Sequence, residues 1–237
     1  MIKHYPIQQL GKADHGWLKS SHHFSFAHYY NPKRTGFGRL RVVNDDWVAP
    51  GTGFSTHPHK NMEIISFVRS GALTHKDSNG NEGITSAGEV QVMSAGTGIT
   101  HSEYNSSKEA LTFYQIWIEP NKYNVKPRWD SKIFPQDATS TDLPLLVSGY
   151  ESDKEQALFI HQEARIYGGK LNKGVQIDFN IDHQAYVLAS SGSFEIRDNQ
   201  QKVVMQTGDG AEVDQQSVMT INALSDAEII IIDAPLH

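Results

Sequence analysis

The sequence contains no cysteine. This absence excludes disulfide bonds, cysteine-ligated zinc, iron–sulfur clusters and thiol catalysis. An apolar signal-peptide segment is also missing from the first ten residues. The longest aliphatic run, Ile229 to Ile232, is too short to cross a bilayer. We therefore expect a cytoplasmic protein that does not bind membranes.

Positive charge is scarce as well. The chain has 21 lysine and arginine residues against 27 aspartate and glutamate residues, for a net charge of −6. Nucleic-acid binding requires a basic face that neutralises phosphates, so we expect no such partner. The 237 residues suffice for one large or two small domains, and 38% hydrophobic residues is ordinary for a globular protein. We expect a monomer.

Short runs rich in β-branched and aromatic residues recur from residue 54 onward, separated by glycine turns and without amphipathic helices between them. Four such runs are Glu63–Arg69, Ala72–Lys76, Val90–Met93 and Leu111–Ile118. Many short strands at even spacing predict an all-β sandwich or barrel. The acidic stretch Asn44-Asp45-Asp46 predicts a turn that joins two short strands between residues 40 and 48.

Proline marks a boundary between two halves. Residues 119–146 hold four of the nine prolines, which predicts a domain at 1–125, a linker at 126–145 and a second domain at 146–237. The second half repeats the strand-and-turn pattern, but its histidines, His161, His183 and His237, are far apart in sequence. We therefore expect it to hold no metal of the same kind.

The first half contains two pairs of metal-binding residues, His57-Pro-His59 and His101-Ser-Glu103. Residues two apart on a strand face the same way, so each pair can act together. Three imidazoles and a carboxylate suit one divalent transition metal ion. By strand alternation Glu63 also shares a face with His57 and His59, so either Glu63 or Glu103 could complete the site.

Other candidate residues are interpreted as structural. His22, His23 and His28 are not spaced to share a strand face, and we expect this aromatic segment to pack over a barrel mouth or a neighbouring sheet. The isolated His75 is assigned to the core, and Asn105 to a turn. Four further residues are assigned to the core, with a pocket role as the alternative: Tyr104, Phe113, Gln115 and Trp117.

The two metal-binding stretches resemble the two cupin motifs. Gly51, His57, His59 and Glu63 match the first motif, and the second, looser match comprises Gly88, Gly96-Thr-Gly98, His101 and Asn105. More narrowly, the chain resembles the pirin family of bicupins over roughly residues 20–120. The phrases that carry this resemblance are Phe24-Ser-Phe26-Ala, Asn44-Asp-Asp, Thr56 through Glu63, and Met93 through Asn105.

This resemblance implies two β-barrel domains of the jelly-roll (double-stranded β-helix) type, with a metal only in the first. It also implies that Glu103, rather than Glu63, joins His57, His59 and His101 as the fourth ligand. One ion is expected, with Fe(II) preferred and Mn, Ni, Co, Cu or Zn as alternatives. Some small bacterial pirins have quercetin 2,3-dioxygenase activity.

We therefore expect a dioxygenase that cleaves a flavonol with O2, in which Glu103 also takes the proton of the flavonol 3-hydroxyl. The alternative is a redox-sensitive metal-binding regulator that acts through a protein partner without turnover, as the animal family members suggest. An enzyme predicts a concave apolar pocket at the metal, whereas a partner-binding protein predicts an exposed apolar patch.

Overall fold

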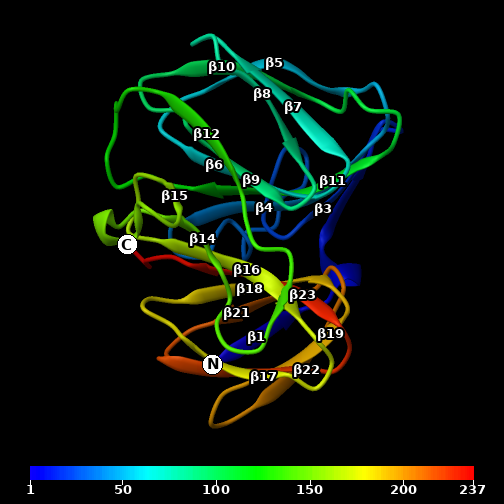
Figure 1. Ribbon diagram of the computed structural model, residues 1–237, viewed down its shortest axis with the longest axis vertical. Coiled ribbons are helices and arrows are strands. Elements are labelled where there is room, and N and C mark those ends of the chain that lie inside the picture. The colour runs from blue at the N-terminus through cyan, green and yellow to red at the C-terminus, as the bar shows by residue number, and fades with distance from the viewer. The chain divides into compact units, whose positions relative to one another are not determined.

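Alternating apolar and polar residues form short antiparallel strands along nearly the whole chain (Figure 1) in the computed structural model, which describes residues 1–237. The only helical segments are two single 3-10 turns, η1 (Ile7–Gln9) and η2 (Glu151–Asp153), and neither could span a bilayer. The predicted all-β class is confirmed.

The chain divides into two compact units. The N-terminal unit comprises Gly11–Phe134 and Leu158–Gln162, and the C-terminal unit comprises Met1–Leu10, Pro135–Ala157 and Glu163–His237. This division differs from the boundaries expected from sequence. Residues 1–10 belong to the C-terminal unit because β1 (Ile2–Tyr5) pairs with β21 (Gly210–Val213). Residues within the expected linker form a strand of the N-terminal unit, β12 (Arg128–Ile133).

Two sheets build the N-terminal unit. The larger sheet has the order β12-β9-β6-β11-β4-β3-β2, and the smaller has the order β5-β10-β7-β8. The further strands of the larger sheet are β2 (Gly11–Asp14), β3 (Leu18–His22), β4 (Leu40–Val48), β6 (Glu63–Ser70), β9 (Glu89–Ser94) and β11 (Leu111–Ile118). Those of the smaller sheet are β5 (Gly53–His59), β7 (Ala72–Asp77), β8 (Glu82–Ser86) and β10 (Ile99–Tyr104). The short β15 (Leu158–Phe159) also belongs to this unit.

The stretch from Leu40 to Val48 forms one continuous strand, β4, so the prediction of two strands joined by an acidic turn is wrong. The polar side chains of this strand point to its two faces. Asn44 and Asp46 point inward between the sheets, whereas Asp45 points outward and pairs with Arg69. Because these side chains have partners or a cavity to face, the acidic run does not need a turn to reach water.

The C-terminal unit has the same two-layer design. One sheet follows the order β1-β21-β18-β23-β16-β14, with β13 beside β16, and the other follows β17-β22-β19-β20. The remaining strands are β13 (Ala138–Thr139), β14 (Leu145–Ser148), β16 (Arg165–Leu171), β17 (Gln176–Asn180), β18 (Ala185–Ser191), β19 (Ser193–Arg197), β20 (Lys202–Gln206), β22 (Val218–Ala223) and β23 (Ala227–Asp233). Apolar residues such as Phe194, Met205, Met219 and Ile231 fill its interior.

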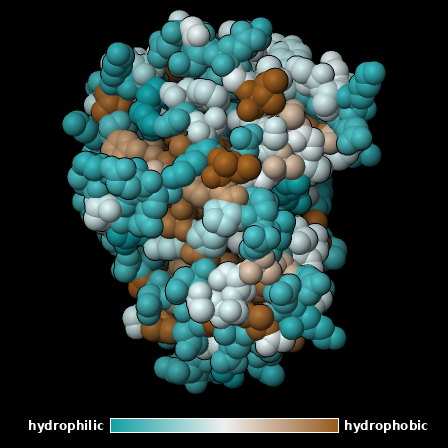
Figure 2. Space-filling view, in the orientation of Figure 1, coloured by the Kyte–Doolittle hydropathy of each residue, from teal (hydrophilic) through white to brown (hydrophobic).

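Inside the N-terminal unit, two apolar clusters are separated by a polar layer. One cluster contains Val68 and Phe113, and the other contains Ile64 and Met93. Both clusters bury apolar surface, which is the main favourable term in folding. On the outside, large exposed hydrophobic residues are few, and hydrophilic residues cover most of the face shown in Figure 2.

Candidate metal centre

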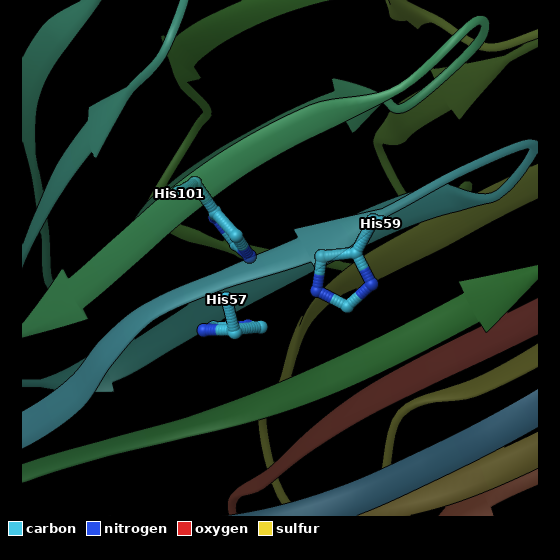
Figure 3. A group of neighbouring side chains, drawn as sticks. All are labelled: His57, His59 and His101. Carbon is cyan, nitrogen blue, oxygen red and sulfur yellow. The ribbon is translucent and has the colours of Figure 1, made fainter.

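His57 and His59 on β5 meet His101 on β10. The two strands pair antiparallel, with His57 opposite His101 and His59 opposite Ile99. The three imidazole rings project toward one another (Figure 3), with centroids 4.5 to 4.9 Å apart. One ring nitrogen from each residue lies within 4.8 Å of the others. The structure therefore brings together the three histidines that the sequence predicts.

The ring nitrogens of this group are arranged as metal ligands require. Nδ1 of His57 lies 2.7 Å from the Ser55 carbonyl oxygen, which can only accept, so Nδ1 carries a proton and Nε2 is the nitrogen that can bind a metal. Nε2 of His101 is buried and has no hydrogen-bond partner. Burial lowers the pKa of His59 to about 4 and that of His101 to about 2, and the nearby His57 contributes to both shifts. Low pKa values keep His59 and His101 neutral near pH 7, as ligands of a divalent transition metal ion must be.

Glu103 lies two residues after His101 on β10 and is 1% exposed. Its carboxylate lies within 4.8 Å of a ring nitrogen of His101, in a group that does not include His57 or His59. Three side chains donate to it: Gln91 Nε2 at 2.9 Å, Gln115 Nε2 at 2.8 Å and Ser66 Oγ at 3.3 Å. Burial, and to a smaller extent Asp46, raise the pKa of Glu103 to about 7, against the lowering effect of these donors. The role of Glu103 as fourth ligand stays a prediction.

A row of polar residues across the larger sheet holds this carboxylate. Neighbouring strands place His22 opposite Asn44, Asn44 opposite Gln115, Gln115 opposite Ser66, and Ser66 opposite Gln91. All five therefore lie at one level of the sheet, between the two apolar clusters. Of these five, Gln115 has a pocket role as its expected alternative from the sequence. The row could not be found without the strand order, because its members come from five strands.

Glu63 is not part of either group of metal-binding side chains. It starts β6, after a loop at residues 60–62 that separates it from β5, so its expected shared face with His57 and His59 is wrong. Its carboxylate is 1% exposed and accepts a hydrogen bond from Ser94 Oγ at 2.7 Å and another from the backbone amide of His161. Burial raises the pKa of Glu63 to about 7, against these two donors.

His75 is the functional candidate that the sequence analysis missed. It lies on β7 opposite Glu103, is fully buried, and forms a second group of metal-binding side chains with His101 and Glu103. Its Nε2 lies 3.0 Å from Asp77 Oδ2, and its ring stacks on Trp129 at 5.1 Å. In the sequence, the spacing of His75 and Asp77 two residues apart indicates that both side chains face the same way. Only the pairing of β7 with β10 shows that they face His101 and Glu103.

A cavity of about 380 Å³ opens beside the histidines. Its lining is mainly aromatic and apolar, with a polar side formed by His22, Asn44 and Gln115 of the row and by Asp46. The lining residues are Trp17, Leu18, Ser20, His22, Phe26, Asn44, Asp46, Gly53, Phe54, Ser55, His57, His59, Glu103, Gln115 and Trp117. This size and lining are typical of small-molecule sites. The pocket alternative for Gln115 and Trp117 is confirmed, whereas Phe113 is core and Tyr104 is 38% exposed.

The segment that begins at His22 contributes to one wall of this cavity, as expected for aromatic residues at a barrel mouth. Phe26 contacts Trp117 edge-to-face at 5.5 Å, and His22 is held by Asn44 Oδ1 at 2.8 Å from its Nδ1. Asn105 instead donates to the carbonyls of Val48 and Glu109, so its assignment to a turn is confirmed.

Comparison with known proteins agrees with this architecture. The family model described as Pirin matches residues 4–118, and the model described as Quercetinase C-terminal cupin domain matches residues 145–234. A pirin-like protein of Caulobacter vibrioides is 47% identical over 99% of this chain and 100% of its own length. The chain belongs to the pirin family. The expected bicupin fold, with two cupin domains, is thereby confirmed.

Two of the matches, one to a sequence and one to a solved structure, come from Escherichia coli. The protein named quercetin 2,3-dioxygenase is 41% identical over 99% of both chains. The crystal structure of the bacterial pirin YhhW in complex with nickel(II) matches with a TM-score of 0.91 and 39% identity, and covers 99% of each chain. A metal ion is therefore present in a solved pirin structure of the same fold.

Proposed function

We propose that this pirin is a metal-dependent dioxygenase that cleaves a flavonol such as quercetin with O2. One observation carries the proposal: an aromatic cavity of about 380 Å³ is lined by His57, His59 and the buried Glu103, and the ring of His101 lies against those two histidines. An enzyme needs a concave apolar pocket of this kind, whereas a partner-binding regulator needs an exposed apolar patch. The name of the E. coli relative supports the same substrate class.

In this proposal His57, His59, His101 and Glu103 hold one divalent ion, with Fe(II) as the first choice. When bound, such an ion supplies Lewis-acid and redox chemistry toward a phenolic oxygen and O2. The protein contributes the rest. Trp17, Phe26, Phe54 and Trp117 bind the flat rings and exclude water, which strengthens electrostatic interactions inside the cavity.

Glu103 has the second proposed role. Glu103 is one of the residues that line the cavity, so we assign to its carboxylate the removal of the proton of the flavonol 3-hydroxyl. Gln91 and Gln115 donate one hydrogen bond each to opposite oxygens of this carboxylate, Oε1 and Oε2, and thereby fix its plane. A base held in this way needs little reorganisation when the substrate arrives.

Oxygen uptake tests the proposal. Protein reloaded anaerobically with Fe(II), Mn(II), Ni(II) or Co(II), with the bound metal measured, is given quercetin while O2 and the flavonol absorbance are followed. We expect metal-dependent uptake that falls by at least about 100-fold in His101→Ala and in Glu103→Ala. The control is His183→Gln, in the C-terminal unit, which should keep full activity.

If wild-type protein is shown to hold each of the four metals in turn and takes up no O2 with any of them, the dioxygenase proposal is refuted and the partner-binding alternative is favoured. Full activity in Glu103→Ala would refute the assignment of Glu103 alone.

A further inference from the structure

We infer that His75 and Asp77 form a buried hydrogen-bond chain that positions His101, fixing its tautomer so that Nε2 faces the metal. This inference rests on the proposed metal site and adds two positioning residues to it. The chain runs from Asp77 Oδ2 to His75 Nε2 over 3.0 Å, and from His75 Nδ1 to His101 Nδ1 over 3.5 Å. All three side chains are almost fully buried.

The direction of each hydrogen bond follows from the partners of Asp77, the residue at the end of the hydrogen-bond chain away from His101. Asp77 accepts from the backbone amides of Asn79 and Asn81 through Oδ1, at 2.9 and 3.1 Å, and from Asn81 Nδ2 through Oδ2, at 2.9 Å. Every one of these partners is a donor, so the Asp77 side chain acts as an acceptor throughout. His75 Nε2 must then carry the proton that it shares with Asp77.

The tautomer of His101 is fixed by the same reasoning. A neutral imidazole with a proton on Nε2 has a bare Nδ1, so His75 Nδ1 can only accept. The partner nitrogen, His101 Nδ1, must therefore donate, and this leaves His101 Nε2 bare. That atom is the buried nitrogen without a partner, and His101 projects from β10 toward His57 and His59 (Figure 3).

The surroundings hold the chain in place. His75 stacks on Trp129 with an angle of 10° between the ring planes. Trp129 Nε1 donates to Gln91 Oε1 at 3.3 Å, and Gln91 donates to Glu103. The residues that position His101 are thus connected to those that position Glu103 through the stacked rings of His75 and Trp129. His75 itself has both ring nitrogens engaged, which argues against a second metal ion in the group that it forms with His101 and Glu103.

Two substitutions of His75 separate this role from simple packing. His75→Leu removes the acceptor for His101 Nδ1. His75→Asn keeps an acceptor, because its Oδ1 occupies about the position of Nδ1 along the side chain. The matched control is Glu82→Gln, which changes an exposed residue that pairs with Lys76 next to His75.

The first measurement is Ni(II) affinity, obtained by competition with a chromophoric chelator. Loss of a hydrogen-bond partner behind a metal-binding histidine typically weakens metal affinity by about 10- to 100-fold, which we expect for His75→Leu. His75→Asn should stay within about threefold of wild type, and Glu82→Gln should match it. Equal affinity in His75→Leu and wild type would overturn the inference, as would an equal loss in His75→Asn and His75→Leu.

The second measurement needs neither metal nor activity. Imidazole 15N chemical shifts of metal-free protein report which nitrogen of His101 carries the proton. We expect the Nδ1-protonated form in wild type and in His75→Asn, and its loss in His75→Leu. An Nε2-protonated His101 in wild type would refute the inference. Failure of quercetin turnover in metal-loaded protein would count against the proposed reaction but would leave this tautomer result standing.

Discussion

Three carboxyl groups in the N-terminal unit are buried with different partners: Glu63, Asp46 and Glu103. Burial raises the pKa of each to about 7. Glu103 receives three donors and faces His101, Asp46 lines the cavity, and Glu63 lies on the other side of the larger sheet. Buried carboxyl groups with similar pKa values therefore have different roles, and the neighbouring residues determine the role of each.

The stability of the metal-free protein should depend on pH through Glu63. Its carboxyl is protonated in both states well below its usual pKa of 4.5, and the folded state keeps the proton until about pH 7. Between these values the unfolded chain loses the proton first, so rising pH favours unfolding. Relative to wild type, Glu63→Gln should therefore gain about 2 to 3 kcal/mol in free energy of unfolding from about pH 5 to about pH 8.

Urea unfolding at the two pH values measures this difference, with the exposed Glu109→Gln as control. A constant difference between Glu63→Gln and wild type across this range would show that Glu63 does not bind a proton more tightly in the folded state.

At the scale of elements, the turn between β9 and β10 sets the position of His101. Gly96 in this turn has a φ of +46°, and a Cβ there would lie 2.1 Å from the Val125 carbonyl oxygen. Gly51, before β5, has a similar φ of +69° but open space around the position of a Cβ. Both glycines belong to the cupin motifs, but they are required for different reasons. Gly51 is needed only for its backbone conformation, whereas Gly96 is also needed because a Cβ would meet the backbone of Val125.

Alanine substitutions should reveal this difference. Gly51→Ala should cost about 1 kcal/mol in free energy of unfolding, because only the left-handed backbone is unfavourable. Gly96→Ala should cost at least about 1 kcal/mol more, because the backbone of residue 125 must also move. Urea unfolding of the two variants tests this order, and equal costs would contradict the close approach at Gly96.

At the scale of the whole molecule, the two units share an architecture but differ in what fills them. Apolar side chains such as Phe194 and Met205 occupy the interior of the C-terminal unit, whereas the polar row, the histidines and a cavity interrupt the interior of the N-terminal unit. A close-packed apolar interior leaves neither ligands nor space for an ion.

We expect one bound ion per chain, and a stability that depends on it. At a free metal concentration about 100 times the Kd, binding should raise the free energy of unfolding of the N-terminal unit by about 2.7 kcal/mol. Elemental analysis gives the stoichiometry, and urea unfolding with and without Ni(II) gives the stabilisation, which His101→Ala should abolish. Two ions per chain, or equal stabilisation of His101→Ala, would contradict a single site at the three histidines.

The sequence by itself determined the fold class and the three histidines, because both depend on short-range spacing, and its motifs carried the resemblance to the pirin family of bicupins. Alternation along a strand places His57 beside His59, and glycine turns mark where strands end. The same rule failed at Glu63, where a loop interrupts the alternation, and at Asn44 to Asp46, where buried partners allow a strand to continue through acidic residues.

Only the tertiary structure decided which residues support the site. His75 and Asp77 reach His101 because β7 pairs with β10, and Gln91, Ser66 and Gln115 reach Glu103 because three strands of the facing sheet align in register. These residues are far apart in sequence, and no local pattern specifies which strands become neighbours. Strand order and register follow from burying the apolar faces of both sheets together, which is a property of the whole domain.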